Sequence, residues 1–198
     1  MRPSNAWIRG ANSLMPPELR VLWAQSVPAY FHSRFSATGR RYLYVILESG
    51  QAPALARQCV TWSSRPLDDA AMHTASKILV GEHDFTSFRS AACQSRSPFR
   101  NVFSIAVRRV EGFVVIDVTA NAFLHHMVRN IAGALLQVGS GDREPMWVRD
   151  AMQALDRRIV GATAPPTGLY LVDVQYGGEF GIPGARIPMI LKAAGDVW

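Results

Sequence analysis

The stretch from Phe123 to Val138 constrains the fold more than any other part of the chain. Apolar residues recur through it at intervals of three and four positions, which predicts a helix with Asn121 as its cap and Gly139 just past its end. Almost every side of that helix is apolar, so other elements must cover it on more than one side. The chain therefore needs a folded core built from several elements.

The single arginine of this stretch, Arg129, has no partner close to it in the sequence. No Asp or Glu occurs between Asp117 and Asp142. A guanidinium is costly to bury unpaired, so Arg129 must reach water, meet an RNA phosphate or pair with a carboxylate from a distant part of the chain. The residues alone leave these three alternatives open.

Other patterns predict strands as well as helices. Strands are expected at 41–48, 58–62, 102–110, 112–120 and 169–176, with a hairpin turn at Glu111–Gly112, and further helices at 66–80 and 145–155. Because strands and helices do not alternate regularly, we expect an α+β fold, an antiparallel sheet with helices packed on one face.

The expected domain occupies residues 29–176. Residues 1–28 show no complete helix or strand pattern and are interpreted as a linker or the remnant of a preceding segment. Residues 177–198 are rich in Gly and Pro and are expected to form a loosely held tail.

Cysteine content and the apolar pattern exclude several classes of protein. Cys59 and Cys93 are the only cysteines, which excludes a disulfide scaffold and a four-cysteine zinc site. No apolar run approaches the roughly 18 residues of a membrane span, and the start of the chain lacks the apolar segment of a secretory signal. His125 and His126 have no further ligands at a suitable spacing. We therefore expect a cytoplasmic protein with no metal and no membrane partner.

Charge is distributed unevenly along the chain. The 21 Lys and Arg exceed the 15 Asp and Glu, which gives a net charge of +6. No acid occurs between Glu18 and Glu48 or between Asp84 and Glu111, and both stretches contain arginines. Such stretches predict a positive surface for a polyanion such as RNA, and the alternative is an ordinary solvated face.

The second acid-free stretch predicts a long functional loop. Three phenylalanines are interleaved with arginines there, at Phe85, Phe88 and Phe99 and at Arg89, Arg96 and Arg100. We expect the phenylalanines to anchor the loop to the core and the arginines to contact RNA phosphate.

Five segments, in order along the chain, resemble motifs of the tRNA pseudouridine synthase A family. They are Phe35 to Tyr44, Gly81 to Phe88, Cys93 to Arg96 with Arg100 and Asn101, Asn121 to Asn130, and Gly168 to Leu171. The resemblance implies a pseudouridine-synthase-like fold and an enzyme that isomerises uridine to pseudouridine in the anticodon stem-loop of tRNA. It further implies a homodimer that uses no metal or organic cofactor.

The resemblance also implies roles for single residues. Tyr42 corresponds to a tyrosine that stacks on the target base and either takes part in removing the C5 proton or serves only as a stacking platform. Arg129 corresponds to the basic residue that pairs with a nucleophilic Asp, and Leu169 to a leucine that packs against the base. The remaining expected tRNA contacts are arginines, namely Arg40, Arg41, Arg89, Arg96 and Arg100.

One motif of the family is absent from this sequence. The nucleophilic Asp of the family lies in a Gly-Arg-Thr-Asp-Ala-Gly-Val-His motif, and no such run occurs here. We therefore expect a C-terminal half of the enzyme that is inactive on its own. The alternatives are a non-catalytic RNA-binding module and a subunit that completes another chain carrying the Asp.

Overall fold

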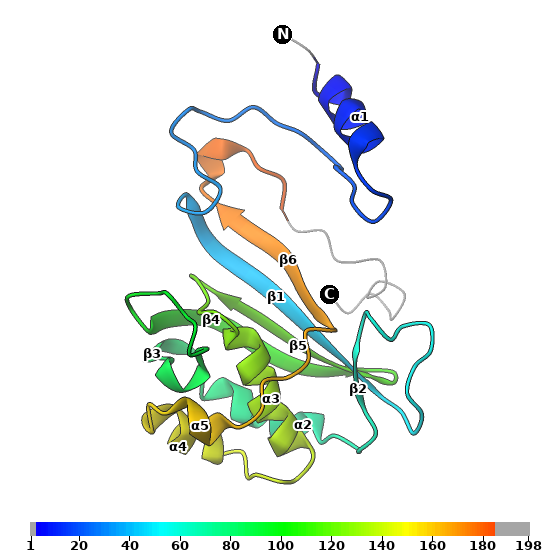
Figure 1. Cartoon of the computed structure of the whole chain (residues 1–198). Coiled ribbons are helices and arrows are strands. Elements are labelled where there is room, and N and C mark those ends of the chain that lie inside the picture. The colour runs from blue at the N-terminus through cyan, green and yellow to red at the C-terminus, as the bar shows by residue number, and fades with distance from the viewer. Residues whose placement is uncertain (1–2, 185–198) are drawn as a thin grey trace. The chain divides into compact units, whose positions relative to one another are not determined.

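A computed structural model describes residues 3–184 of the chain (Figure 1). Contacts divide these residues into two compact units, residues 3–37 with 176–183 and residues 38–175 with Gly184. Of the tail expected at 177–198, residues 185–198 lie outside the described part. None of the helices in the described part combines the length and apolar character that crossing a bilayer requires.

A six-stranded sheet forms the centre of the larger unit. Its strands are β1 (Ala37–Glu48), β2 (Thr61–Ser63), β3 (Gly81–Asp84), β4 (Phe99–Val110), β5 (Phe113–Ala120) and β6 (Leu169–Tyr176). The order is β2-β1-β5-β4-β3, and β6 also pairs with β1. The pairs β1–β5, β3–β4 and β4–β5 are antiparallel, which agrees with the predicted type of sheet, whereas β1 and β2 run parallel.

Helices cover one face of this sheet, as Figure 1 shows. They are α2 (Asp69–Lys77), α3 (Met127–Gly139), α4 (Trp147–Gln153) and α5 (Arg157–Val160), with a short 3-10 helix, η1 (Thr86–Phe88). The main core lies between these helices and the sheet. The predicted α+β class, with helices on one face, is confirmed.

Strand β1 separates two apolar clusters, because its side chains alternate between the faces of the sheet. Tyr44 and Ile46 belong to the core under the helices. Leu43 and Val45 belong to a smaller cluster on the opposite face. The alternation predicted for residues 41–48 is confirmed, and it places Tyr42 on the helix-covered face.

Helix α3 is buried over most of its surface, as its sequence predicts. The predicted start at Phe123 is wrong, because the helix begins at Met127. The Asn121 side chain accepts hydrogen bonds from the backbone N–H groups of Asn101 and Ala122, at 3.0 and 2.7 Å, and so does not cap the helix. His126 precedes the first helical residue with φ 62°, in the left-handed region, which ends helical geometry on that side.

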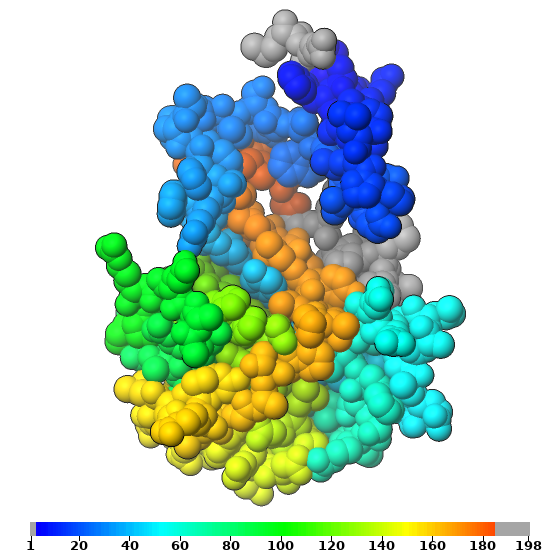
Figure 2. Space-filling view, viewed as in Figure 1, coloured from blue at the N-terminus to red at the C-terminus, as the bar shows by residue number. Residues whose placement is uncertain are grey.

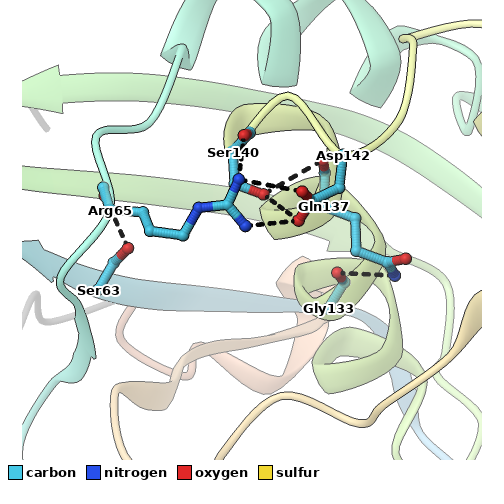
Figure 3. Close-up of polar contacts among 6 residues, drawn as sticks. All are labelled: Ser63, Arg65, Gly133, Gln137, Ser140 and Asp142. Carbon is cyan, nitrogen blue, oxygen red and sulfur yellow. Dashed lines mark hydrogen bonds and ion pairs between the residues drawn. The ribbon is translucent and has the colours of Figure 1, made fainter.

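An arginine outside the helix binds the C-terminal end of α3 (Figure 3). The Arg65 guanidinium donates to the Ser140 carbonyl at 2.6 Å and to both carboxylate oxygens of Asp142, at 2.7 and 3.0 Å. A cation is favourable at this end of a helix because the last carbonyl groups carry partial negative charge. This contact fixes the chain before α2 against α3.

The structure confirms part of the prediction for the acid-free loop and corrects the rest. Strand β3 was not predicted, and it pairs with the start of β4, where Asp84 lies opposite Phe99. Phe85 and Phe88 are fully buried, which confirms them as anchors. The prediction for Phe99 is wrong, because its side chain is 54% exposed on the edge-proximal strand β4.

The smaller unit contains α1 (Ser4–Leu14), which the sequence pattern did not predict, and the 3-10 helix η2 (Gly178–Phe180). None of the α1 side chains is buried. The Phe31 ring packs against the rings of Tyr176 and Phe180, with centroids 5.1 and 5.0 Å apart. These aromatic contacts join the segment before β1 to the last residue of β6 and to η2.

Candidate active site

A pocket of about 340 Å³ lies where the N-terminal end of α3 meets β1 and β6. Tyr42 from β1, Arg129 from α3 and Leu169 from β6 all line it. The rest of the wall comes from the segment that leads into α3, namely Phe123, Leu124, His125, His126, Met127 and Val128. Three residues thus share one pocket although they are far apart in the sequence. They are the three to which the family resemblance assigns roles.

The connection between α5 and β6 holds this part of the pocket together. The Ala164 N–H donates to the Arg129 carbonyl at 3.2 Å, and the Ala164 carbonyl accepts from Arg129 Nε at 2.7 Å. Gly168 then passes so close to β1 that a Cβ there would collide with the Val45 carbonyl, and its φ is +85°. Only glycine fits this position. The close approach to β1 brings the next residue, Leu169, into the pocket wall.

A buried tyrosine beneath the pocket ties the same connection to the sheet. The Tyr44 hydroxyl donates to the Pro165 carbonyl at 2.8 Å and lies 2.6 Å from the Thr61 hydroxyl. Burial raises the pKa of Tyr44 to about 12, although Thr61 and Arg129 oppose the shift. Tyr44 is therefore neutral at physiological pH and serves as a fixed hydrogen-bonding group.

Arg129 is half-buried and is held by neutral groups. Its Nε donates to Ala164, and its Nη1 lies 3.4 Å from His126 Nε2. No carboxylate among residues 3–184 forms an ion pair with it. Since a guanidinium carries five N–H donors, Arg129 keeps donors for an anion.

Tyr42 presents its ring edge-on to Phe123, with centroids 5.1 Å apart and an interplanar angle of 84°. Burial raises the pKa of the Tyr42 hydroxyl, and the positive charge of Arg40 opposes the increase. Arg40 itself donates to the Asn121 carbonyl at 2.7 Å, on the segment that leads into α3. Tyr42 is thus a half-buried, protonated phenol whose ring faces the pocket.

Two polar residues that support the helix were not assigned roles from the sequence. Asn130 is fully buried, and its amide donates to the Phe88 carbonyl at 2.7 Å. Its Oδ1 accepts from Arg157 Nη2 at 3.0 Å and from the Thr163 hydroxyl at 2.8 Å. A polar residue in an apolar helix could have indicated Asn130, whereas nothing in the sequence connects it with Arg157.

Comparison with known proteins shows the family of the chain. Residues 75–177 match the family profile described as tRNA pseudouridine synthase. A tRNA pseudouridine synthase A of Legionella pneumophila is 51% identical over 181 residues, which cover 91% of this chain and 69% of the relative. The chain belongs to the tRNA pseudouridine synthase family. Relatives of the same name in Coxiella burnetii and Pseudomonas aeruginosa are each 48% identical, over 95% and 99% of this chain and 71% and 69% of their own lengths.

Of the arginines that the family resemblance connects with tRNA, three belong to the loop between η1 and β4 or its edges. Arg89 is half-buried and donates to the Cys93 carbonyl at 3.2 Å. Arg100 is half-buried, and its guanidinium is held by Ser95 Oγ at 2.7 Å. Arg96 is exposed, and the green loop that contains it stands out from the surface in Figure 2.

This loop is joined directly to the pocket wall. The Ser90 N–H donates to the carbonyl of His125, a pocket residue, at 2.9 Å. This hydrogen bond places the start of the loop beside the pocket wall.

Arg41 lies apart from the other predicted family residues. Its side chain points to the face of the sheet opposite Tyr42, because neighbouring residues of a strand alternate. There it forms an ion pair with Asp117 on β5, with contacts of 2.9 and 2.6 Å. The hydrogen bond that the Arg41 side chain donates to Asp117 raises the pKa of Arg41. The structure does not bring Arg41 to the pocket.

Proposed function

We propose that this protein takes part in the isomerisation of uridine to pseudouridine in the anticodon stem-loop of tRNA. The observation that carries the proposal is the convergence of Tyr42, Arg129 and Leu169 on one pocket. In the proposed complex the target base leaves the RNA stack and enters the pocket. There Leu169 packs against it and Tyr42 stacks on it.

The proposed role of Arg129 is to pair with a nucleophilic carboxylate. The carboxylate attacks the nucleoside, the glycosidic bond from N1 breaks and the base turns. C5 then joins the sugar as the bond to the carboxylate breaks, the C5 proton leaves and N1 takes up a proton. Arg129 suits this role because it is half-buried and has donors that no carboxylate among residues 3–184 takes up. A positive charge there stabilises the ionised carboxylate.

The 198 residues contain no Gly-Arg-Thr-Asp motif, and the chain spans about 70% of the length of its relatives. We therefore propose that the Asp comes from residues outside this sequence and that the 198-residue chain alone has no turnover. A homodimer that acts on tRNA in the cytoplasm is part of the same proposal.

The test measures tritium release from tRNA labelled at C5 of uridine. We expect none from the 198-residue chain and turnover from a fusion to the part of the Pseudomonas aeruginosa relative that lies outside the match. Replacing Arg129 with Gln in the fusion should abolish turnover. Turnover by the unfused chain would contradict the proposed need for an external Asp.

A non-catalytic RNA-binding module is the second candidate, and the exposed Arg96 loop favours it. It predicts tRNA binding by the chain and no turnover by the fusion. Mass spectrometry of the RNA after chemical labelling of pseudouridine would separate the two functions, because only the enzyme changes the base.

A further inference from the structure

His126 adopts an unusual backbone conformation at the entrance to α3. It is one of three non-glycine residues with positive φ among residues 3–184, and its φ and ψ are 62° and 5°. Side chains rarely adopt this conformation, and it persists only where the surroundings require it. Here it directs the chain from the pocket wall into the first turn of α3.

The contact between His126 and Arg129 defines the state of the imidazole. Arg129 Nη1 lies 3.4 Å from His126 Nε2, three residues away on the first turn. A guanidinium only donates hydrogen bonds, so Nε2 must accept and must carry no proton. His126 is then neutral, with its proton on Nδ1.

The groups that face His126 favour this neutral form. Burial lowers the pKa of His126, and the nearby His125, Arg129 and Arg157 lower it further. The His125 ring lies against it, with centroids 3.9 Å apart. No carboxylate in the described part of the chain pairs with His126 to stabilise an imidazolium.

We propose that neutral His126 is a positioning residue that orients the Arg129 guanidinium in the pocket. With Nε held by Ala164 and Nη1 held by His126, the plane of the guanidinium is fixed from two sides. Protonation of His126 converts the acceptor into a donor and places a second cation beside Arg129, which ends the contact. The inference deepens the proposed function and rests on its assignment of Arg129 as the partner of the nucleophile.

Nitrogen NMR of the labelled 198-residue chain tests the contact directly. We expect His126 to show an unprotonated Nε2 at neutral pH and a titration midpoint below the ordinary value of about 6.5. The Arg129 Nε–H signal should shift with the same midpoint. In Arg129→Gln the midpoint of His126 should rise, because a neighbouring cation is lost.

Matched variants separate positioning from a general structural role. In His126→Gln the side-chain oxygen can replace Nε2 as acceptor without titrating, so the Arg129 signal should remain ordered and lose its pH dependence. In His126→Ala the Arg129 Nε–H signal should indicate a disordered side chain at every pH. The control His125→Gln should keep the coupling between His126 and Arg129.

Three results would overturn the inference. These are a proton on His126 Nε2 at neutral pH, an Arg129 signal that does not follow the His126 titration, and an Arg129 signal that keeps its pH dependence in His126→Gln. The measurement requires neither RNA nor turnover, so a failure of the proposed function is recognised separately, by the fusion assay. In an active fusion, turnover should decrease as the pH falls through the titration midpoint of His126. In His126→Gln this decrease should be absent.

Discussion

At the scale of single residues, the pocket combines charged, aromatic and apolar side chains whose states are set by their surroundings. Arg129 is held by a carbonyl and an imidazole and not by a carboxylate, so its charge is uncompensated within residues 3–184. Burial raises the pKa of Tyr42 further above neutral pH, so its phenol is protonated. A protonated phenol can stack on a base at neutral pH. It must lose its own proton before it can remove the C5 proton of the target base.

Tyr42→Phe tests the two roles of this residue. We expect tRNA affinity to be retained, because the ring still stacks, and turnover of the fusion to fall about 10²- to 10⁴-fold, the usual contribution of a positioned acid or base. Tyr42→Ala should weaken affinity as well. Tritium release and filter binding measure the two quantities.

Tyr170→Phe is the matched control for that change. The Tyr170 hydroxyl donates to the Cys59 carbonyl at 2.6 Å, and its ring packs on the opposite cluster of the sheet. Its loss should lower the free energy of unfolding by about 0.5–1.5 kcal/mol and leave turnover unchanged. Full turnover in Tyr42→Phe would leave stacking as the only role of Tyr42.

At the scale of elements, the pocket depends on how closely α3 approaches the connection after α5. A Cβ on Gly133 would lie 2.5 Å from the Ala162 carbonyl and 3.4 Å from the Ala164 nitrogen. Both neighbours are backbone, so neither can turn away as a side chain would. The same connection holds Arg129, which couples the packing of α3 to the geometry of the pocket.

Gly133→Ala should therefore destabilise the larger unit. We expect the free energy of unfolding to fall by about 1–3 kcal/mol, because overpacking forces the backbone to shift. The Arg129 Nε–H signal should shift as well, since its acceptor at Ala164 moves. Urea unfolding and NMR measure these effects.

Gly10→Ala provides the control, because Gly10 lies in α1 and nothing lies within 4 Å of an added Cβ. Alanine favours a helix over glycine by roughly 1 kcal/mol, so this change should not destabilise the chain. Equal destabilisation by the two substitutions would argue against a specific clash at Gly133.

At the scale of the whole molecule, the chain carries an excess of positive charge, and Arg96 on the loop beside the pocket is exposed. The net charge is +6, and the loop that carries Arg96 is bonded to the pocket wall through Ser90 and His125. Arg109, by contrast, is neutralised within the chain by Glu48 and Asp69. We therefore predict that the loop contacts the phosphate backbone of the proposed tRNA ligand.

Binding of tRNA should accordingly weaken steeply with salt. Arg96→Ala should lower the affinity and reduce the slope of log affinity against log salt by about one, because one phosphate contact and its released counterion are lost. Filter binding at several salt concentrations measures the slope. Arg158→Ala is the control, since the exposed Arg158 pairs with Asp156.

An unchanged slope in Arg96→Ala, or the same decrease in Arg158→Ala, would show that the loop is not the contact. Such a result would favour the alternative that the loop is an ordinary solvated face. It would not affect the proposed role of the pocket.

Local patterns in the sequence determined much of the architecture. Alternation predicted the two faces of β1 and the hairpin of β4 and β5, and the apolar periodicity predicted the burial of α3. These predictions held because burial acts on each residue according to the period of its own element. The motif of the family marked Tyr42, Arg129 and Leu169, although it did not define their geometry.

Only the tertiary structure decided how these residues meet. Asn121 bonds to β4 instead of capping α3, so the helix starts four residues later than its apolar pattern suggests. The contacts of Arg129 with Ala164 and of Asn130 with Arg157 join positions 35 and 27 residues apart. Such contacts follow from the packing of separate elements, which periodicity within one element does not contain.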